Sequence, residues 1–319
     1  MNDKICYFLA SAWLGGVMAL PALDQKPAQR EVDAPALAGI QAVKPVRSSE
    51  VAHSSNPSEF DLTKPLPNDT PSLKTLAEKG NAKAQYELGK KYSYGKEVEY
   101  DSKEAVKWYR KAAEQEHAKA QYSLGAMYWY GEGVEKDMAQ AYLWMSLAAE
   151  QKHQTAREWK GKAAAELTSE QIKKVEVNQL EFQSERGSAK AQFLLAGKYY
   201  YGDGIEKNKK EAVKWYRKAA EQEYVLAQFY LAGMYDRGHG VEKDEKEAVE
   251  WVRKAAEQGH AEAQVNVAIM YQYGMGVPQN DAETINWFSK AAEQGYVRAQ
   301  YDLGLMYYHG LGLPRNLAE

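Results

Sequence analysis

The sequence predicts an all-α fold made of about six to seven stacked helix–loop–helix repeats of 36 residues. One observation is that the 14-residue stretch KEAVKWYRKAAEQE occurs twice without change, at 103–116 and at 210–223. The other is a glutamine that ends phrases such as AKAQ and AEAQ at intervals of 36, 71, 36, 36 and 36 residues. It stands at Gln85, Gln121, Gln192, Gln228, Gln264 and Gln300. Repeats of this size bury their apolar faces only against neighbouring copies, so a stacked array is expected.

The first helix of each repeat follows a fixed pattern after its glutamine. A small residue stands four positions later and is expected to let two helix backbones approach closely, and a tyrosine stands seven positions later. A glycine ten positions later is suited to ending the helix in a left-handed conformation. This glycine recurs as Gly95, Gly131, Gly202, Gly238, Gly274 and Gly310. A second glycine follows two residues after it, except in the first repeat, which has Glu97.

The second helix of each repeat begins at an Asp or Asn. Glu or Gln follows three residues later, which is close to a capping box. A tryptophan and then an alanine pair lie inside the helix. We expect the tryptophan to be core and the alanines to form a thin ridge for the next repeat. The tryptophans are Trp108, Trp144, Trp215, Trp251 and Trp287.

The combined pattern A-x-A-Q-x-x-L-G-x-x-Y-x-x-G-x-G-V-x-x-D…A-x-x-W-x-x-K-A-A-E-Q-G resembles the Sel-one-like repeat (SLR) family, relatives of the tetratricopeptide repeat. The resemblance covers roughly residues 70–319. It implies a right-handed α/α solenoid that acts as an interaction scaffold or adaptor. Many bacterial members of the family are exported.

Residues 154–188 keep the length of a repeat but lose its tyrosine and its double-glycine loop. Thr168 with Gln171 supplies a different capping box, for a longer helix. In the SLR family such a segment often closes an array. We therefore expect two sub-arrays, 70–186 ending in this degenerate repeat and 187–319.

The N-terminal residues differ in composition from the repeats. Residues 1–22 contain a short apolar run at 5–20 followed by small residues, which predicts a secretory signal peptide. This run is short for a membrane span, so no stable membrane insertion is expected after cleavage. Residues 23–69 are rich in Pro, Ala and Ser and are expected to be a disordered tether. The predicted location is therefore the periplasm or the exterior of the cell, for a mature chain without the single cysteine, Cys6.

The sequence ends on Asn316-Leu317-Ala318-Glu319, which has the pattern of a capping box with no helix behind it. We therefore expect an incomplete last repeat. The apolar side of the helix at 296–309 would then be uncovered, and self-association through this repeat is a possible consequence.

The sequence favours no cofactor, metal or nucleic-acid site. The net charge is −3 with a pI near 6.2, whereas a nucleic-acid footprint needs a basic face. Three histidines share a helix-start position that elsewhere holds tyrosine, and no two stand four apart on a helix. Ser93 and Lys96 fit S-x-x-K, and some cysteine-rich family members have been proposed to hydrolyse β-lactams. Partner motifs and paired cysteines are lacking here, so β-lactam or peptidoglycan hydrolysis is the least supported function and no enzyme is predicted.

The residues eight and nine positions after each glutamine vary between repeats and include many aromatic side chains. First helices of such a solenoid line its concave surface, and Tyr, Trp and Arg are favoured interface anchors. We therefore predict a protein-binding groove that contains Trp129, Tyr130, Tyr200, Tyr201, Asp236, Arg237, Tyr273 and Tyr308. The alternative for the second residue of each pair is packing against the loop. The predicted function is an exported scaffold or adaptor, and the alternative is a periplasmic immunity or inhibitor protein that binds a secreted toxic effector.

Overall fold

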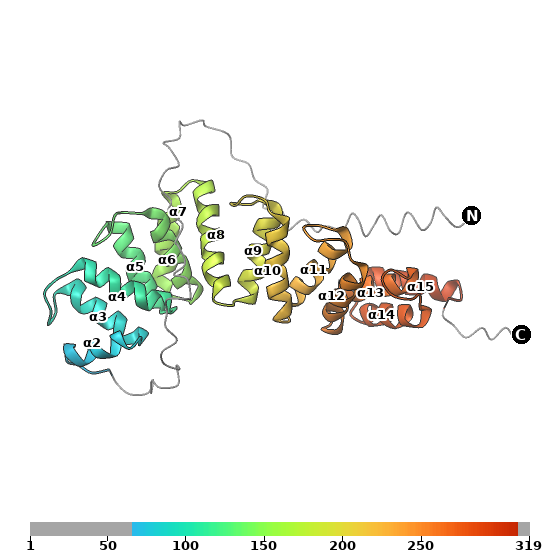
Figure 1. The fold of residues 1–319 in the computed structure, drawn as a ribbon, viewed down its shortest axis with the longest axis horizontal. Helices are drawn as coiled ribbons and strands as arrows, with labels where there is room; N and C mark the ends of the chain where they lie inside the picture. The colour runs from blue at the N-terminus through green and yellow to red at the C-terminus, as the bar shows by residue number, and fades with distance from the viewer. Residues whose placement is uncertain (1–65, 312–319) are drawn as a thin grey trace, which may run out of the picture. The chain divides into compact units, whose positions relative to one another are not determined.

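The computed structural model describes residues 66–311, all of which fall within the unit Gln41–Glu319 (Figure 1). The predicted signal peptide at 1–22, most of the tether at 23–69 and residues 312–319 of the incomplete last repeat lie outside the described residues. Between 66 and 311 the chain forms 14 helices and no strand, which confirms the all-α prediction. The helices are α2 (Thr70–Glu78), α3 (Ala82–Tyr94), α4 (Ser102–Glu114), α5 (Ala118–Tyr130), α6 (Met138–Glu150), α7 (Gln154–Ala165), α8 (Ser169–Glu185), α9 (Ala189–Tyr201), α10 (Lys209–Glu221), α11 (Val225–Arg237), α12 (Glu245–Glu257), α13 (Ala261–Tyr273), α14 (Asp281–Glu293) and α15 (Val297–Tyr308).

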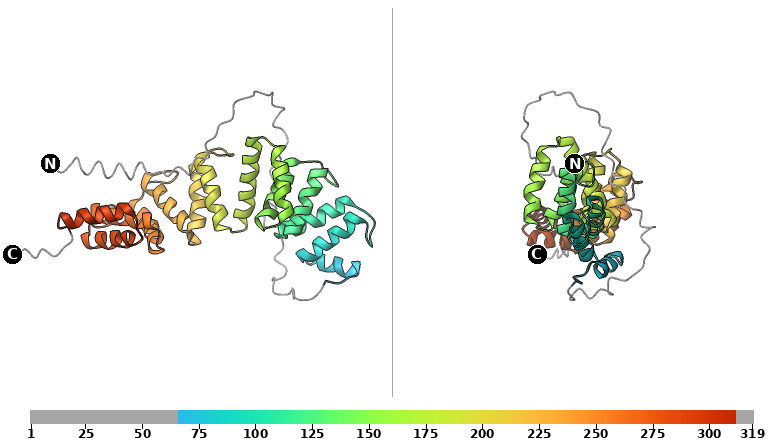
Figure 2. Two further views of the ribbon diagram at one scale, coloured as in Figure 1. Left: turned by 180° about the vertical axis from the view of Figure 1, so that it is seen from behind. Right: turned by 90° about the vertical axis from the view of Figure 1, so that its left-hand side faces the viewer.

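Neighbouring helices pack in chain order, as expected for an all-α solenoid, except that α8 packs on α6 in place of α7 (Figures 1 and 2). The first helices of the repeats are α3, α5, α7, α9, α11, α13 and α15. The core lies between repeats: one cluster joins Tyr109 of α4, Leu124 of α5, Trp144 of α6, Ala163 of α7 and Val175 of α8. Each repeat therefore depends on its neighbours for burial of its apolar side chains.

The glutamine that marks the repeat is a buried link between three helices. In α11 the side-chain amide of Gln228 donates to the carbonyl of Ala220 at the end of α10, 3.2 Å away. Its side-chain oxygen accepts from Gln258 at the end of α12. The same two bonds are made by Gln85, Gln121, Gln192 and Gln264, except that Ser184 replaces alanine as the carbonyl for Gln192. The repeat period is thus set by a hydrogen-bond requirement as well as by packing.

The small residue four positions after the glutamine serves two purposes. At Gly89 an added Cβ would lie 2.7 Å from the ring of Tyr109, so this glycine makes room for a side chain of α4, and the expected close backbone approach is not seen there. At Gly125 an added Cβ would lie 2.9 Å from Met145 and 3.3 Å from the backbone oxygen of Ala141. A Cβ at Gly304 would meet no atom within 4 Å, so of these three glycines only Gly125 comes near the predicted backbone contact.

The two loop glycines are confirmed as conformational requirements. The first glycine has a positive φ and ends α3, α5, α9, α11 and α13. The second also has a positive φ and lies against the preceding repeat: a Cβ at Gly240 would be 2.3 Å from the backbone oxygen of Lys209. The second glycine therefore lets each loop rest on the start of the preceding second helix.

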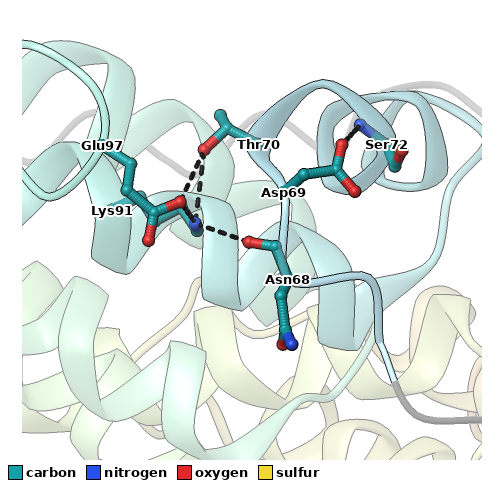
Figure 3. A network of polar contacts seen from close by, with 6 residues as sticks. All are labelled: Asn68, Asp69, Thr70, Ser72, Lys91 and Glu97. Atoms are coloured by element: carbon teal, nitrogen blue, oxygen red, sulfur yellow. Dashed lines mark hydrogen bonds and ion pairs between the residues drawn. The ribbon is translucent and has the colours of Figure 1, made fainter.

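The first repeat replaces this contact with a polar network (Figure 3). Glu97 keeps the left-handed conformation, with φ 65°, and its carboxylate accepts from Lys91 and from Thr70 at the start of α2. The Lys91 ammonium also donates to the backbone oxygen of Asn68 at 3.1 Å. The Lys91 bond holds the pKa of the Glu97 carboxyl below its usual value. Polar bonds thus join α2 to the first repeat.

A second lysine marks the repeat that follows α8. Lys198 stands in the position of Lys91, and the other repeats have buried Met127, Met234, Met270 and Met306 there. Its ammonium donates to Asp203 at 2.6 Å and to Glu176 of α8 at 3.3 Å. The two lysines stand in the first repeats of the sub-arrays 70–186 and 187–319. Because α8 packs against both α6 and α9, the helix array is continuous there, and the division into sub-arrays stays a prediction.

The second helices begin at the predicted Asp or Asn, but the backbone N–H of that residue donates to the tyrosine carbonyl of the first helix, so these starts are not reciprocal capping boxes. Asp101, Asp137, Asn208, Asp244 and Asn280 each accept a backbone N–H of the first turn. A reciprocal capping box is formed at Thr168 and Gln171 in α8. Four of the five repeat tryptophans are buried, whereas Trp215 is half-buried with the Lys218 ammonium 4.0 Å from its ring centroid. Within 66–311 no helix is both long and apolar enough to cross a bilayer.

Candidate protein-binding surface

One side of the first helices carries the variable residues. It consists of the positions two before the glutamine and two, five and nine after it, which we call the first-helix face. Spacings of four, three and four residues place them on one side of a helix. In α9 these positions are Lys190, Leu194, Gly197 and Tyr201.

The residue before the loop glycine is exposed in most first helices. Tyr94, Tyr130, Tyr201 and Tyr273 are between 40% and 77% exposed, and we call them the tyrosine row. Packing against the loop, the alternative for this position, is therefore not what the structure shows for these four side chains. In α11 the position is held by Arg237, which is half-buried.

Trp129 lies largely beneath this surface. Its side chain packs against the core and meets the ring of Trp159 edge-on, with centroids 5.2 Å apart. Trp159 also contacts Tyr130, at 5.9 Å, and the Lys162 ammonium lies 4.5 Å from its ring centroid. Trp159 was not predicted as a surface residue, because the degenerate repeat lacks the glutamine that marks the other first helices. The phrase His153-x-x-Ala156 aligns with the helix starts of other repeats and would have placed Trp159 on the first-helix face.

Tyr200 and Asp236 are also not free surface groups. The Tyr200 hydroxyl is 3.0 Å from His239 Nδ1, so the loop of the next repeat holds it. Asp236 is only 7% exposed, and burial raises the pKa of its carboxyl against the opposing charges of Lys243 and Arg237. Of the eight residues predicted for the groove, Tyr130, Tyr201, Tyr273 and Tyr308 are the exposed ones.

The candidate chemical groups have structural partners. The Ser93 hydroxyl donates to the Lys90 carbonyl at 3.0 Å and lies 3.0 Å from the Tyr109 hydroxyl. Burial raises the pKa of Tyr109 to about 12, so this phenol gives Ser93 no general base at neutral pH. Among residues 66–311, no group of three or more His, Cys, Asp and Glu side chains could hold a metal ion.

The histidines at helix starts act as caps. Nδ1 of His117, His153 and His260 accepts the backbone N–H three residues later, at 3.1–3.2 Å. Each ring also lies 4.8 Å from the aromatic ring of the preceding repeat. The expected packing role at a helix start is therefore seen, with a capping bond in addition.

The sequence model of the Sel1 repeat family matches residues 82–117, 118–153, 189–224, 225–260, 261–296 and 297–319. The chain belongs to the Sel1 repeat family. Each full match begins at the first residue of a first helix, and the unmatched 154–188 is the segment predicted to be degenerate. Sel1 repeat proteins are scaffolds for protein interaction.

Three solved structures show the range of similarity. A protective antigen with an SLR fold, from uropathogenic Escherichia coli, is 38% identical over 77% of this chain and 53% of its own, with a TM-score of 0.48. A Sel1 repeat protein from Oxalobacter formigenes is 34% identical over 76% of this chain and 71% of its own, with a TM-score of 0.45. An immunity protein from Pseudomonas aeruginosa is 20% identical over 70% of this chain and 83% of its own, with a TM-score of 0.32. This Sel1 repeat chain thus spans about half the length of the Escherichia coli protein, and a search of curated proteins gave no match.

Proposed function

We propose that this Sel1 repeat protein is an exported scaffold that binds another protein through the tyrosine row on its first helices. The supporting observation is that Tyr94, Tyr130, Tyr201 and Tyr273 expose much of their rings at the same position of four repeats. Tyrosine contributes a large contact area with few rotatable bonds, and it is enriched among residues that dominate binding energy. A row of such side chains suits a partner that crosses several repeats.

The second predicted function, inhibition of a secreted toxic effector, would use the same surface. At 20% identity the Pseudomonas aeruginosa immunity protein does not argue for it. The partner's identity separates the two functions, because an inhibitor's partner would be a toxin whose activity falls on binding. Export is part of the proposal and depends on residues 1–22, which cell fractionation with and without that segment would test.

The test begins with a photo-crosslinking side chain at position 130 of the full chain, used to identify the partner from cell-envelope extract. Binding of the purified partner is then measured by calorimetry. We expect Tyr130→Ala/Tyr201→Ala to weaken binding by about tenfold or more, since each ring contributes roughly 1 kcal/mol or more. Its melting temperature should stay close to that of the unmodified chain, because both rings are at least half exposed.

The matched control is Tyr100→Ala. Tyr100 is 58% exposed but lies in the loop between α3 and α4, outside the tyrosine row. Equal binding by the double variant, Tyr100→Ala and the unmodified chain would show that the partner uses another surface.

A further inference from the structure

An apolar patch lies on the first-helix face at α9 and α11. Leu194 and Leu226 are 43% and 38% exposed, and Tyr201 completes the patch at its end. The matching positions in α13 hold Glu262 and Asn266. Apolar side chains are therefore gathered on two successive first helices, whereas the same face of α13 combines these two polar side chains with Ile269 and Tyr273.

The centre of this patch is bare backbone. Gly197 and Gly233 stand at the same position of α9 and α11, inside the helices. A Cβ at Gly233 would meet no atom within 4 Å, and one at Gly197 would meet only the Tyr216 hydroxyl, at 3.8 Å. Glycine inside a helix is less stable than alanine, and packing requires it at Gly89 but not here. We call Leu194, Gly197, Tyr201, Leu226, Tyr230 and Gly233 the apolar shelf.

A buried polar group points at the shelf. Tyr216 of α10 is only 2% exposed, and its hydroxyl is the atom that a side chain at Gly197 would touch. Within residues 66–311 this hydroxyl has no hydrogen-bond partner. Its counterpart in the duplicated stretch is Tyr109, whose hydroxyl forms a hydrogen bond with Ser93. In α9 the position of that serine is held by Tyr200. Burial raises the pKa of Tyr216, so the phenol stays protonated and its O–H can donate a hydrogen bond to an acceptor.

The charge around the shelf favours an acidic ligand. The guanidinium of Arg237 is close enough to lower the pKa of Tyr201, although burial raises that pKa overall. Towards the N-terminus each first helix adds an exposed lysine to the first-helix face, which also carries Glu87 in α3 and Glu166 at the end of α7. These lysines, which we call the lysine row, are Lys83, Lys119, Lys162 and Lys190. The shelf itself contains no carboxylate, and the next helix, α13, brings Glu262 to this face.

We propose that the apolar shelf anchors an acidic, extended segment of the partner protein, with an apolar side chain over Gly233 and a carboxylate that accepts a hydrogen bond from Tyr216. Further acidic residues of the segment lie along the lysine row. The shelf supplies apolar contact area, and the Tyr216 hydroxyl supplies a hydrogen bond. A purely apolar ligand would leave this hydroxyl without an acceptor. This inference rests on the proposed function, because it names the partner chemistry for the same face.

Three fluorescent peptides of equal length test the chemistry: one of alternating Glu and Leu, one with Gln for Glu and one with Lys for Glu. Anisotropy with the full chain should show the tightest binding for the Glu peptide, weaker binding for the Gln peptide and the weakest for the Lys peptide. Added salt should weaken binding of the Glu peptide, because the lysine row is exposed. Equal binding of the Glu and Gln peptides would overturn the proposal.

Two variants test the site. Tyr216→Phe removes only the unpartnered hydroxyl and should weaken Glu-peptide binding by about tenfold, with no loss of thermal stability. Tyr109→Phe is the matched control from the duplicated stretch and should bind the peptide as the unmodified chain does. Gly233→Leu fills the shelf from a position where a Cβ meets no atom within 4 Å, and it should abolish binding while the helix content is kept. Unchanged peptide binding by either Tyr216→Phe or Gly233→Leu would overturn the proposal.

The same variants separate this inference from the proposed function. If the crosslinked partner is lost from Tyr130→Ala/Tyr201→Ala but binds Gly233→Leu and Tyr216→Phe normally, the scaffold function stands and the apolar shelf is wrong. If the partner binds all three variants as it binds the unmodified chain, both proposals fail.

Discussion

The side-chain amide of Gln258 donates a 2.8 Å hydrogen bond to the side-chain oxygen of Gln228. Gln228 in turn donates to the carbonyl of Ala220, so one buried carboxamide joins α10, α11 and α12. The Ala220 carbonyl also accepts the backbone N–H of Glu223 at 3.0 Å, so the glutamine adds a second donor to this helix end and gives the Gln258 amide its acceptor.

Replacing this glutamine should destabilise the array. In Gln228→Leu the Gln258 amide loses its acceptor, and the Ala220 carbonyl keeps only its bond from the Glu223 N–H, at a cost of about 1–3 kcal/mol. The urea midpoint should fall accordingly. Gln300→Leu is the control, because Gln300 occupies the same position but is exposed, and its change should stay within about 0.5 kcal/mol. A shift at Gln300 as large as that at Gln228 would contradict the structural role.

Both copies of the duplicated stretch end on a residue that the backbone disfavours. Glu116 and Glu223 have φ of 63° and 62°, whereas the same position holds Gly259 and Gly295 in later repeats. Left-handed backbone costs a residue with a side chain about 1 kcal/mol relative to glycine. Glu223→Gly should therefore raise the urea midpoint, and the reverse change Gly259→Glu should lower it by a similar amount. Loss of stability in Glu223→Gly would show that the glutamate makes a compensating contact.

The sequence was sufficient to predict the repeat, its loops and the starts of its helices, because these features depend on residues close together in the chain. The left-handed glycines, the Asp and Asn caps and the capping box at Thr168 are of this kind. Gly240 is necessary because a side chain there would clash with Lys209 of the preceding repeat. The glycine could still be predicted from the sequence, because it recurs at the same position of the repeats.

The candidate surface was less predictable, because exposure depends on which side chain the next repeat contributes. Tyr200 and Tyr201 are neighbours in the sequence, yet the loop residue His239 holds one and leaves the other exposed. The hydroxyl of Tyr216 lost its partner through a Ser-to-Tyr difference at a position 16 residues away, as the matching Ser93–Tyr109 pair shows. The effect of such sequence differences on exposure and hydrogen bonding can be known only from the contacts between repeats.

The second loop glycine should tolerate no side chain. Gly240→Ala places a Cβ 2.3 Å from the Lys209 carbonyl oxygen in a left-handed conformation, and we expect a loss of about 1–3 kcal/mol or more. Gly233→Ala, inside α11 with nothing within 4 Å, should instead gain up to about 1 kcal/mol from helix propensity. Thermal unfolding followed by circular dichroism compares them. Similar melting temperatures for the two variants would contradict the close contact between loop and preceding helix.

The capping histidines should make the array sensitive to mild acid. His117 and His260 accept their capping bonds through Nδ1, which must carry no proton, and burial lowers the pKa of both rings. The unfolded chain therefore binds more protons between the lowered pKa and the ordinary value near 6.5. The stability contributed by this shift is complete above that ordinary value and is lost as the pH falls through the interval.

Asn81 caps α3 at the same position without titrating in this range, through a 2.8 Å bond from Ala84 N–H. His117→Asn/His260→Asn should therefore lose less stability than the unmodified chain between about pH 7.5 and pH 5.5. Urea midpoints at the two pH values give the comparison, and acidic residues affect both proteins alike. The same pH dependence in both proteins would mean that protonation of these two rings is not coupled to folding.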